Sequence, residues 1–493
     1  MKKLLFLFLL LASCDNVEEY YEDAYCIENI NIIDAKQGLK ENMTIIISKN
    51  EIIKIEKTSN FNLSKKNNLI NGSGKFLIPG LWDSHVHFAF EEELASSMFN
   101  LFMAYGITSV RDTGGEINFL KEWKDKSKTN PDLYPRVKIA GPLIDGKFNV
   151  YNGNSVSFPP LSVRTASVKE TEVQVKELIE NGVDFLKAYE MLTPEQFGVI
   201  TKIAKENGLK VSGHIPLSMD VITASNIGLN SIEHLRNIEM SSTSNMEELL
   251  TIRRNALENK KGLLGSSLRT SLHKSQRMSS IKNIDSVQLK KVLNVLAKNN
   301  TWQIPTLILY TGWAYQLYKG LEWRSTFDFL PIEIKEKWNS QIDIVESSVL
   351  NPDYTKDISD NSERKDFADW GQSMTRLMNK MDITFMAGTD TPIGWQTPGY
   401  SLHNELEMLV KSGFTSLEAI EAATYNPALY FNMEDKLGLI KEGYIADLII
   451  LSDNPLNNIS NTKKIETVIK NGNLMNREFL NSLLKEQREK NKL

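Results

Sequence analysis

Apolar and polar residues alternate in short runs at both ends of the chain. The runs are rich in isoleucine and valine, and polar residues separate them. Such a pattern is typical of β-strands that bury one face. A sheet of this size is not stable by itself, so we expect the two ends to pair into one β-sandwich beside a central domain. The predicted strands occupy residues 30–33, 43–48, 52–56, 446–453 and 464–472.

Between the two ends, strand-like and helix-like segments alternate. This order predicts an α/β fold with a parallel sheet and crossover helices. Eight such strands favour a TIM-type (β/α)8 barrel, in which functional side chains gather at the carboxyl ends of the strands. The eight candidate strands are residues 77–87, 106–112, 136–140, 184–189, 210–214, 231–234, 302–307 and 383–390.

Helix-start signals support this alternation. Thr193 and Gln196 form a capping box with Pro194 at the first helical position, and the helix is expected to end near Asn207. A second capping box runs from Thr415 to Glu418.

Two long segments interrupt the predicted barrel, at residues 237–300 and 310–380. Four tryptophans lie in or beside the second segment, where packing is a commoner role than ligand recognition. Insertions that follow strands six and seven are expected to cover the barrel mouth, as a lid or a substrate pocket. The predicted domains are a sandwich (25–76 with 436–475), a barrel (77–435) and a C-terminal tail (476–493).

Composition sets the broad class of the protein. The chain has 493 residues, 41% of them hydrophobic, which is ample for one large domain and a smaller companion. Its formal charge of −5 has no long run of one sign, so a nucleic-acid partner is not expected.

The first residues predict export. Lys2 and Lys3 precede eight apolar residues, too few to span a bilayer, and Cys14 follows a small residue. The segment resembles a bacterial lipoprotein signal, which implies cleavage after residue 13, lipidation of Cys14 and a membrane-anchored chain in the periplasm or at the cell surface. Residues 14–24 then form a tether. With Cys14 lipidated, Cys26 is the one thiol that remains of two cysteines, so no intramolecular disulfide is expected. A plain signal peptide is the alternative.

The chemistry of the chain is predicted from its histidines, which number six. His85 and His87 lie two apart on a predicted strand, so both imidazoles point to one face, as metal ligands do. Two ordinary strand histidines are the alternative. Together with this histidine pair, residues 30–472 resemble the amidohydrolase superfamily, in its prolidase-like and imidazolonepropionase-like branch. The segments 424–428 and 438–447 also carry the resemblance.

The resemblance implies a distorted barrel and a six-residue metal site. It assigns the ligand positions to His85, His87, Lys187, His214, His234 and Asp390. His85, His87 and Asp390 suit one divalent ion, with zinc as first choice, and His214 and His234 suit a second. A lysine ammonium has no lone pair, so Lys187 can bridge two ions only as a carbamate. A surface lysine is the alternative, and one ion per chain would then be expected.

The implied activity is hydrolysis of an amide or peptide bond in a small substrate, with a dipeptide as first choice. Metal-activated hydroxide attacks, and Asp390 acts as general base and then acid. Tyr189 either contacts substrate or only packs, His403 has a structural or second-shell role, and His273 lies in a polar loop with no special role. The alternatives are a single-metal hydrolase of cyclic amides and a surface lipoprotein that binds a ligand without turnover.

Overall fold

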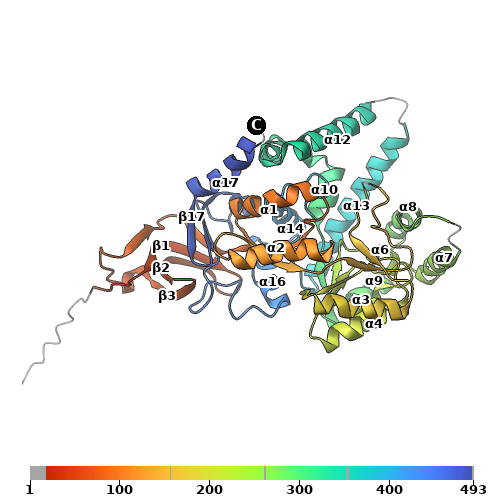
Figure 1. Ribbon diagram of the computed structural model, residues 1–493, viewed down its shortest axis with the longest axis horizontal. Helices are drawn as coiled ribbons and strands as arrows, with labels where there is room; N and C mark the ends of the chain where they lie inside the picture. The colour runs from red at the N-terminus through yellow and green to blue at the C-terminus, as the bar shows by residue number, and fades with distance from the viewer. Residues whose placement is uncertain (1–17, 156, 260–261, 351–354, 491–493) are drawn as a thin grey trace, which may run out of the picture.

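The computed structural model describes residues 18–490 apart from residues 156, 260–261 and 351–354. Cys14, the predicted lipidation site, therefore lies outside the described residues. Figure 1 shows the sheet formed by the chain ends on one side of a larger helix-covered body. Helices α12 (Ile332–Leu350) and α13 (Thr355–Asn379) project from that body at the upper right of the view.

The two chain ends meet in one sheet, as predicted. Strands β5 and β15 pair antiparallel and join the N-terminal strands to the C-terminal ones. Hydrogen bonds link all these strands into a single eight-stranded sheet in the order β17-β16-β15-β5-β1-β2-β3, with β4 beside β1, where the pattern predicted a sandwich. The strands are β1 (Ala24–Asp34), β2 (Gly38–Ser48), β3 (Glu51–Lys57), β4 (Asn68–Asn71), β5 (Phe76–Pro79), β15 (Leu448–Leu451), β16 (Ile465–Lys470) and β17 (Asn473–Asn476).

The central strands are parallel and form two sheets, in the orders β6-β7-β8 and β10-β9-β11-β12-β13-β14. Parallel pairing aligns their carboxyl ends, which is what gathers the site residues described below. The strands are β6 (Leu81–Val86), β7 (Ile107–Asp112), β8 (Arg136–Ile139), β9 (Leu143–Asp145), β10 (Ser162–Arg164), β11 (Leu186–Ala188), β12 (Val211–Gly213), β13 (Ser231–Glu233) and β14 (Trp302–Ile304).

Seven of the eight predicted barrel strands are present, but residues 383–390 form no strand. That segment instead makes isolated parallel bridges, between Gln303 and Phe385 on one side and between Val86 and Thr391 on the other. It therefore lies between β14 and β6 and connects the two sheets. A closed barrel agrees with this arrangement and stays a prediction.

Helices connect the strands and cover the sheets. The Thr193 and Thr415 capping boxes are both present, and the predicted C-terminal tail is largely helical, with α17 packed against α1. In the described part of the chain, no helix combines the length and apolar character needed to cross a membrane. The remaining helices are α1 (Glu92–Ala104), α2 (Ile117–Thr129), α3 (Val168–Glu180), α4 (Pro194–Glu206), α5 (Val221–Ile227), α6 (Ile238–Ser241), α7 (Met246–Glu258), α8 (Gly265–Lys282), α9 (Ser286–Lys298), α10 (Leu307–Ala314), α11 (Leu321–Ser325), α14 (Tyr400–Lys411), α15 (Ser416–Ala422), α16 (Tyr425–Tyr430) and α17 (Arg477–Lys490), with 3-10 turns at η1 (Thr58–Asn60), η2 (Leu317–Lys319), η3 (Thr326–Phe329) and η4 (Ile459–Lys463).

The passage from the end sheet into the central sheet is tight. Gly80 is the single residue between β5 and β6, and its N–H donates to the carbonyl of Asp447 at 2.8 Å. A Cβ at Gly80 would collide with the side chain of Thr108. Only glycine therefore fits beside the Thr108 side chain at this junction.

A buried ion cluster fastens the end sheet to the central sheet. The Asp447 carboxylate accepts from Lys470 Nζ at 3.2 Å and from Arg136 Nη1, and the backbone N–H of Asn471 donates to it at 2.7 Å. Lys470 ends β16 and is fully buried, whereas Arg136 begins β8. Burial, and next the nearby Arg136, hold the pKa of Lys470 well below its ordinary value. Asp447 is thus the counter-charge that this lysine requires.

We expect Asp447→Ala to lower the free energy of unfolding by about 3 kcal/mol, because it leaves a buried ammonium without its partner. Urea denaturation measures the change. Asp435→Ala, at an exposed position nearby in sequence, is the matched control and should cost less than about 0.5 kcal/mol. Equal stabilities of the two variants would show that the cluster does not fasten the sheets.

Candidate metal centre

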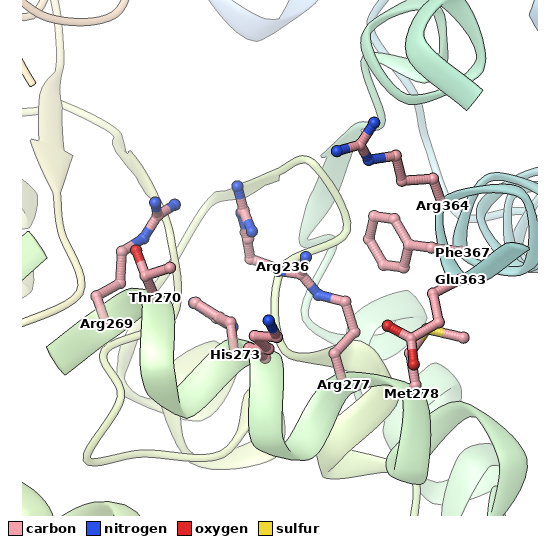
Figure 2. A pocket seen from close by; sticks show the side chains of 10 residues that line it. Arg236, Arg269, Thr270, His273, Arg277, Met278, Glu363, Arg364 and Phe367 are labelled. Atoms are coloured by element: carbon pink, nitrogen blue, oxygen red, sulfur yellow. The ribbon is translucent and has the colours of Figure 1, made fainter. Parts of the chain in front are cut away.

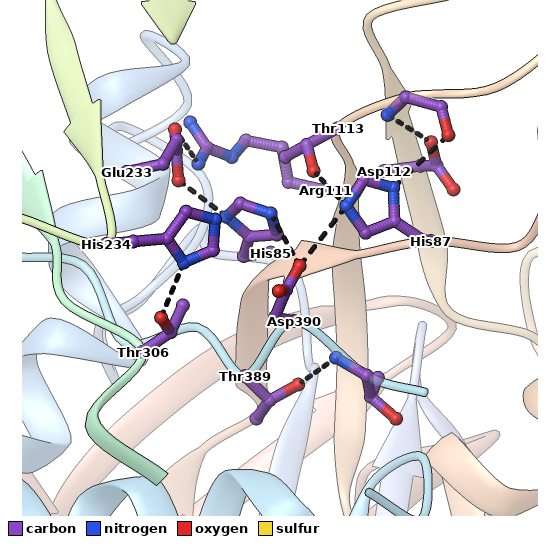
Figure 3. Close-up of polar contacts among 12 residues, drawn as sticks. His85, His87, Arg111, Asp112, Thr113, Glu233, His234, Thr306, Thr389 and Asp390 are labelled. Carbon is purple, nitrogen blue, oxygen red and sulfur yellow. Dashed lines mark hydrogen bonds and ion pairs between the residues drawn. The ribbon is translucent and has the colours of Figure 1, made fainter. Parts of the chain in front are cut away.

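Two histidines and one aspartate meet at the end of β6. His85 is in β6, and His87 is the first residue after that strand. The two histidines are two residues apart, so their side chains share a face, as predicted. Asp390 is the last residue of segment 383–390, which lies between β14 and β6. Its Oδ1 lies 3.0 Å from His85 Nε2 and 3.2 Å from His87 Nε2 (Figure 3). All three side chains are buried.

His234 completes a compact group of metal-ligating atoms. It follows β13, and its ring lies 4.6 Å from that of His85 between centroids. One ligand atom each from His85, His234 and Asp390 lies within 4.8 Å of the others. A ring nitrogen and a carboxylate oxygen at such separations can converge on one ion.

The backbone at this group is strained. His234, Asp390 and Thr306 adopt φ angles of 59°, 73° and 47°, in the left-handed region that residues other than glycine rarely occupy. Each costs on the order of 1 kcal/mol, and such strain concentrates at functional sites. The conformation aims these side chains inward at the strand ends.

Glu233 fixes the ring of His85. Its Oε2 lies 2.6 Å from His85 Nδ1, while Oε1 accepts from Arg111 Nη2 at 2.7 Å and from the Ser212 hydroxyl. Because a carboxylate can only accept, Nδ1 carries a proton toward Glu233, and Nε2 is the ring nitrogen that lies on the side of Asp390. A buried carboxylate of this kind orients metal-binding histidines.

Glu190 does the same for His214, which follows β12. Its Oε1 lies 2.6 Å from His214 Nδ1 and also accepts from Arg269 Nε at 3.1 Å, and its Oε2 lies 2.6 Å from His273 Nε2. Although burial alone would raise it, the pKa of Glu190 is held well below its ordinary value by Arg269 and His273. Burial lowers the pKa of His214 to about 3, so the ring is neutral, as a ligand must be.

His214 and His234 face each other. Their ring centroids are 5.0 Å apart, and Thr306 Oγ1 lies 2.7 Å from His234 Nδ1. Burial also holds the pKa of His234 well below its ordinary value. Both rings are therefore neutral and have one nitrogen engaged, which leaves Nε2 of each for a ligand.

Lys187 lies in the middle of β11 and is fully buried. Its Nζ has no hydrogen-bond partner among the described residues, and the closest carboxylate oxygen, Glu233 Oε1, is 3.9 Å away. Burial lowers the pKa of this ammonium to about 8, against the opposing effect of Glu233. An orphaned, readily neutralised amine beside four histidines is unlike a surface lysine, and it fits a group that is modified in the working site.

The Asp390 carboxyl is ionised. Burial alone would raise its pKa, but His234 and His85 hold it well below the ordinary value. The described donors, four imidazoles and a carboxylate around an orphaned amine, therefore fit a divalent cation of the zinc type.

Of the two remaining predicted site residues, Tyr189 contacts this centre and His403 does not. Tyr189 is buried and packs its ring on His214, 4.5 Å between centroids. His403 lies elsewhere: its ring nitrogens are 2.9 Å from Thr462 Oγ1 and 2.9 Å from the carbonyl of Tyr105. It ties α14 to its neighbours and contacts none of the six predicted ligands.

The prediction for His273 was wrong, and the reason is local. The residue lies in helix α8, is buried, and bonds Glu190. Sequence reasoning took the polar stretch around it for a loop. A signal was present, since Arg269, His273 and Arg277 recur every four residues and so share one helix face. Glu190 and Glu233 were also missed as partners, although each is an acid at the end of a predicted apolar strand.

An aromatic pocket of about 480 Å³ opens near the centre. Tyr151 lines it and also contacts Tyr189, with 5.8 Å between ring centroids. Trp313, Trp338 and Trp395 contribute indoles to its wall, and two of these come from the segment 310–380. A predicted insertion therefore supplies part of the surface beside the candidate ligands.

Comparison with known proteins identifies a family for part of the chain. Residues 368–475 match the amidohydrolase family model. A segment of 100 residues, 19% of this chain, is 40% identical to ochratoxinase from Aspergillus niger, of which it spans 20%.

Solved structures share the fold over a longer range. A Xaa-Pro dipeptidase with bound methionine in the active site superposes with a TM-score of 0.65 at 20% identity, covering 92% of this chain and all of that one. Ochratoxinase from A. niger gives 0.62 at 19% identity, over 92% of this chain and 96% of that one. Bottromycin amidohydrolase gives 0.66 at 15% identity, over 96% and 92%. Residues 368–475, with Asp390 among them, thus carry an amidohydrolase family domain, within a chain that has the fold of these enzymes.

Proposed function

We propose that this protein is a metal-dependent hydrolase of a C–N bond, amide or peptide, in a small substrate. The observation that carries the proposal is the approach of His85 Nε2 and His87 Nε2 to one oxygen of Asp390, with His234 beside them. The family match at residues 368–475 supports an amide substrate. A dipeptide is the first choice, because a Xaa-Pro dipeptidase is among the proteins with this fold.

The six predicted ligands would hold two divalent ions, most simply zinc. His85, His87 and Asp390 would hold the first, and His214 and His234 the second. A carbamate on Lys187 would offer one oxygen to each. Bound zinc would supply a nucleophile at neutral pH, by lowering the pKa of water, and would polarise the scissile carbonyl.

The chain's own groups have separate tasks in this reaction. The ionised Asp390 carboxylate takes a proton from the attacking water and delivers it to the leaving nitrogen, which departs as a neutral amine. Glu233 and Glu190 keep His85 and His214 in the tautomer that presents Nε2. Tyr189 lies where it can contact the bound substrate. No covalent enzyme intermediate is needed.

We expect Asp390→Asn to reduce kcat/KM by about 10³-fold, since the amide cannot accept the proton. The assay is a zinc-supplemented panel of dipeptides and N-acyl amino acids, read by release of the free amine. Asp382→Asn, at an exposed position with a similar left-handed backbone, is the control and should retain activity. Failure of the wild-type chain to cleave any member would reject the peptidase assignment, and full activity of Asp390→Asn would reject the mechanism.

Metal content tests the role of Lys187. We expect the wild-type chain to hold two ions per molecule by elemental analysis and Lys187→Met to hold one or none, because the bridging carbamate is lost. Lys210→Met, at the half-buried residue immediately before β12, is the matched control and should keep two ions. One ion in the wild type would favour the single-metal hydrolase of cyclic amides, with Lys187 as a bystander.

The location of the protein is a separate proposal. Lipidation of Cys14 would anchor the chain to a membrane and place this hydrolase outside the cytoplasm. We expect Cys14→Ser to move the protein from the membrane fraction to the soluble fraction of the cells that express it, as followed by immunoblotting. Unchanged membrane association would reject the anchor and leave the hydrolase proposal untouched.

A further inference from the structure

A second hollow, of about 350 Å³, lies beside the metal centre and is lined mainly by cations. Its wall includes His273, whose ring bonds the same Glu190 that holds His214. A single carboxylate therefore separates this hollow from a predicted metal ligand. The lining residues are Arg236, Arg269, Thr270, His273, Lys274, Arg277, Met278, Glu363, Arg364 and Phe367.

Three elements direct guanidinium groups at this space. Arg269 and Arg277 lie two turns apart on one face of α8. Arg236 follows His234 by two residues, and Arg364 comes from α13 on the opposite side. Figure 2 shows Arg236 between Arg269 and Arg277, with Arg364 across the hollow. Helices α8 and α13 belong to the two predicted insertions, so chain segments outside the parallel strands build this wall.

The lining of the hollow has more positively charged than negatively charged groups. Arg269 pairs with Glu190, Arg277 lies 3.8 Å from Glu239 Oε1, and Glu363 lines the hollow. Among the residues whose side chains the structure describes, five lining cations (Arg236, Arg269, Lys274, Arg277 and Arg364) thus face three carboxylates, an excess of two positive charges.

Two of these guanidinium groups also have one nitrogen that lacks a hydrogen bond. The Nε atoms of Arg236 and Arg277 are buried and have no hydrogen-bond partner among the described residues. Burial, followed by the neighbouring Arg236, lowers the pKa of Arg277. Buried donors without acceptors are costly, and a guanidinium suits a carboxylate, which it can bind through two parallel bonds. The hollow therefore favours an anionic ligand.

We propose that this hollow selects substrates whose leaving half is an acidic amino acid, with both an α-carboxylate and a side-chain carboxylate. The proposal rests on the hydrolase function above and specifies its substrate class. One α-carboxylate would neutralise half of the excess charge, whereas an aspartate or glutamate residue carries the two negative charges that match it. The volume is within the range of small-molecule sites, which begins at about 300 Å³.

Binding and turnover together test this selection. The probes are reduced-amide analogues of Phe-Glu and Phe-Gln, in which CH2–NH replaces the scissile amide, so that neither is cleaved. They have nearly the same shape and differ by one charge. We expect calorimetry on the full, metal-loaded chain to show about tenfold tighter binding of the Phe-Glu analogue.

The arginines contributed by the insertions should carry that preference. In the double variant Arg277→Gln/Arg364→Gln we expect the preference to fall below about threefold. Lys365→Gln is the matched control. Lys365 is next to Arg364 on α13, but its ammonium lies over the ring of Tyr315, so its loss should leave the preference unchanged. Thermal melting of each variant separates loss of selection from loss of folding.

The outcomes distinguish the two proposals. Equal binding of the analogues, or a preference that survives the double variant in its folded state, would overturn the acidic-substrate inference. Cleavage of Phe-Gln would in that case still support the hydrolase. The opposite result is charge-selective binding of the analogues without cleavage of Phe-Glu or any other panel member. It would support the anion site and reject the hydrolase function.

Discussion

The candidate site depends on two buried carboxylates that hold imidazole rings. Glu233 bonds His85 and Glu190 bonds His214, each at 2.6 Å from Nδ1, and neither acid is itself directed at a ligand position. Burying an acid is favourable only where cations compensate it, and Arg111 and Arg269 do so. The consequence is a pair of rings that are held in one orientation, each with Nδ1 engaged. Without these acids the rings could turn, and the lone pairs would not converge.

The fold brings the predicted ligand residues together. Parallel pairing brings the ends of β6, β11, β12 and β13 to one edge, so His85 and His234, about 150 residues apart in sequence, become neighbours. Asp390 reaches the same edge without a strand, through bridges on both sides of its segment. The Asp447 cluster then fixes the end sheet against β8, remote from the chemistry. Stability and reactivity thus rest on different buried charges.

Much of this was accessible from the sequence. Periodicity predicted seven central strands and the pairing of the chain ends, and the spacing of His85 and His87 predicted their shared face. Residues 383–390 were misjudged because an apolar run cannot be distinguished from a strand without its hydrogen-bond partners. The left-handed backbone of His234 left no local signal, since tertiary contacts impose it. Glu190 and Arg269 pair across 79 residues, and no pattern within one element reveals such a pair.

Charge also explains why an arginine-rich wall can stand beside a cation site. Two divalent ions near Arg269 and Arg236 would repel them, and the low dielectric of a buried site strengthens that repulsion. Glu190 lies between, bonded to His214 on one side and to Arg269 and His273 on the other, so its charge screens the two regions from each other. Asp390 and Glu233 supply negative charge on the metal side. An acidic substrate would add negative charge on the arginine side. The same carboxylate that fixes the ring of His214 would thereby allow the proposed arginine-lined hollow to attract anions while the candidate metal centre holds cations.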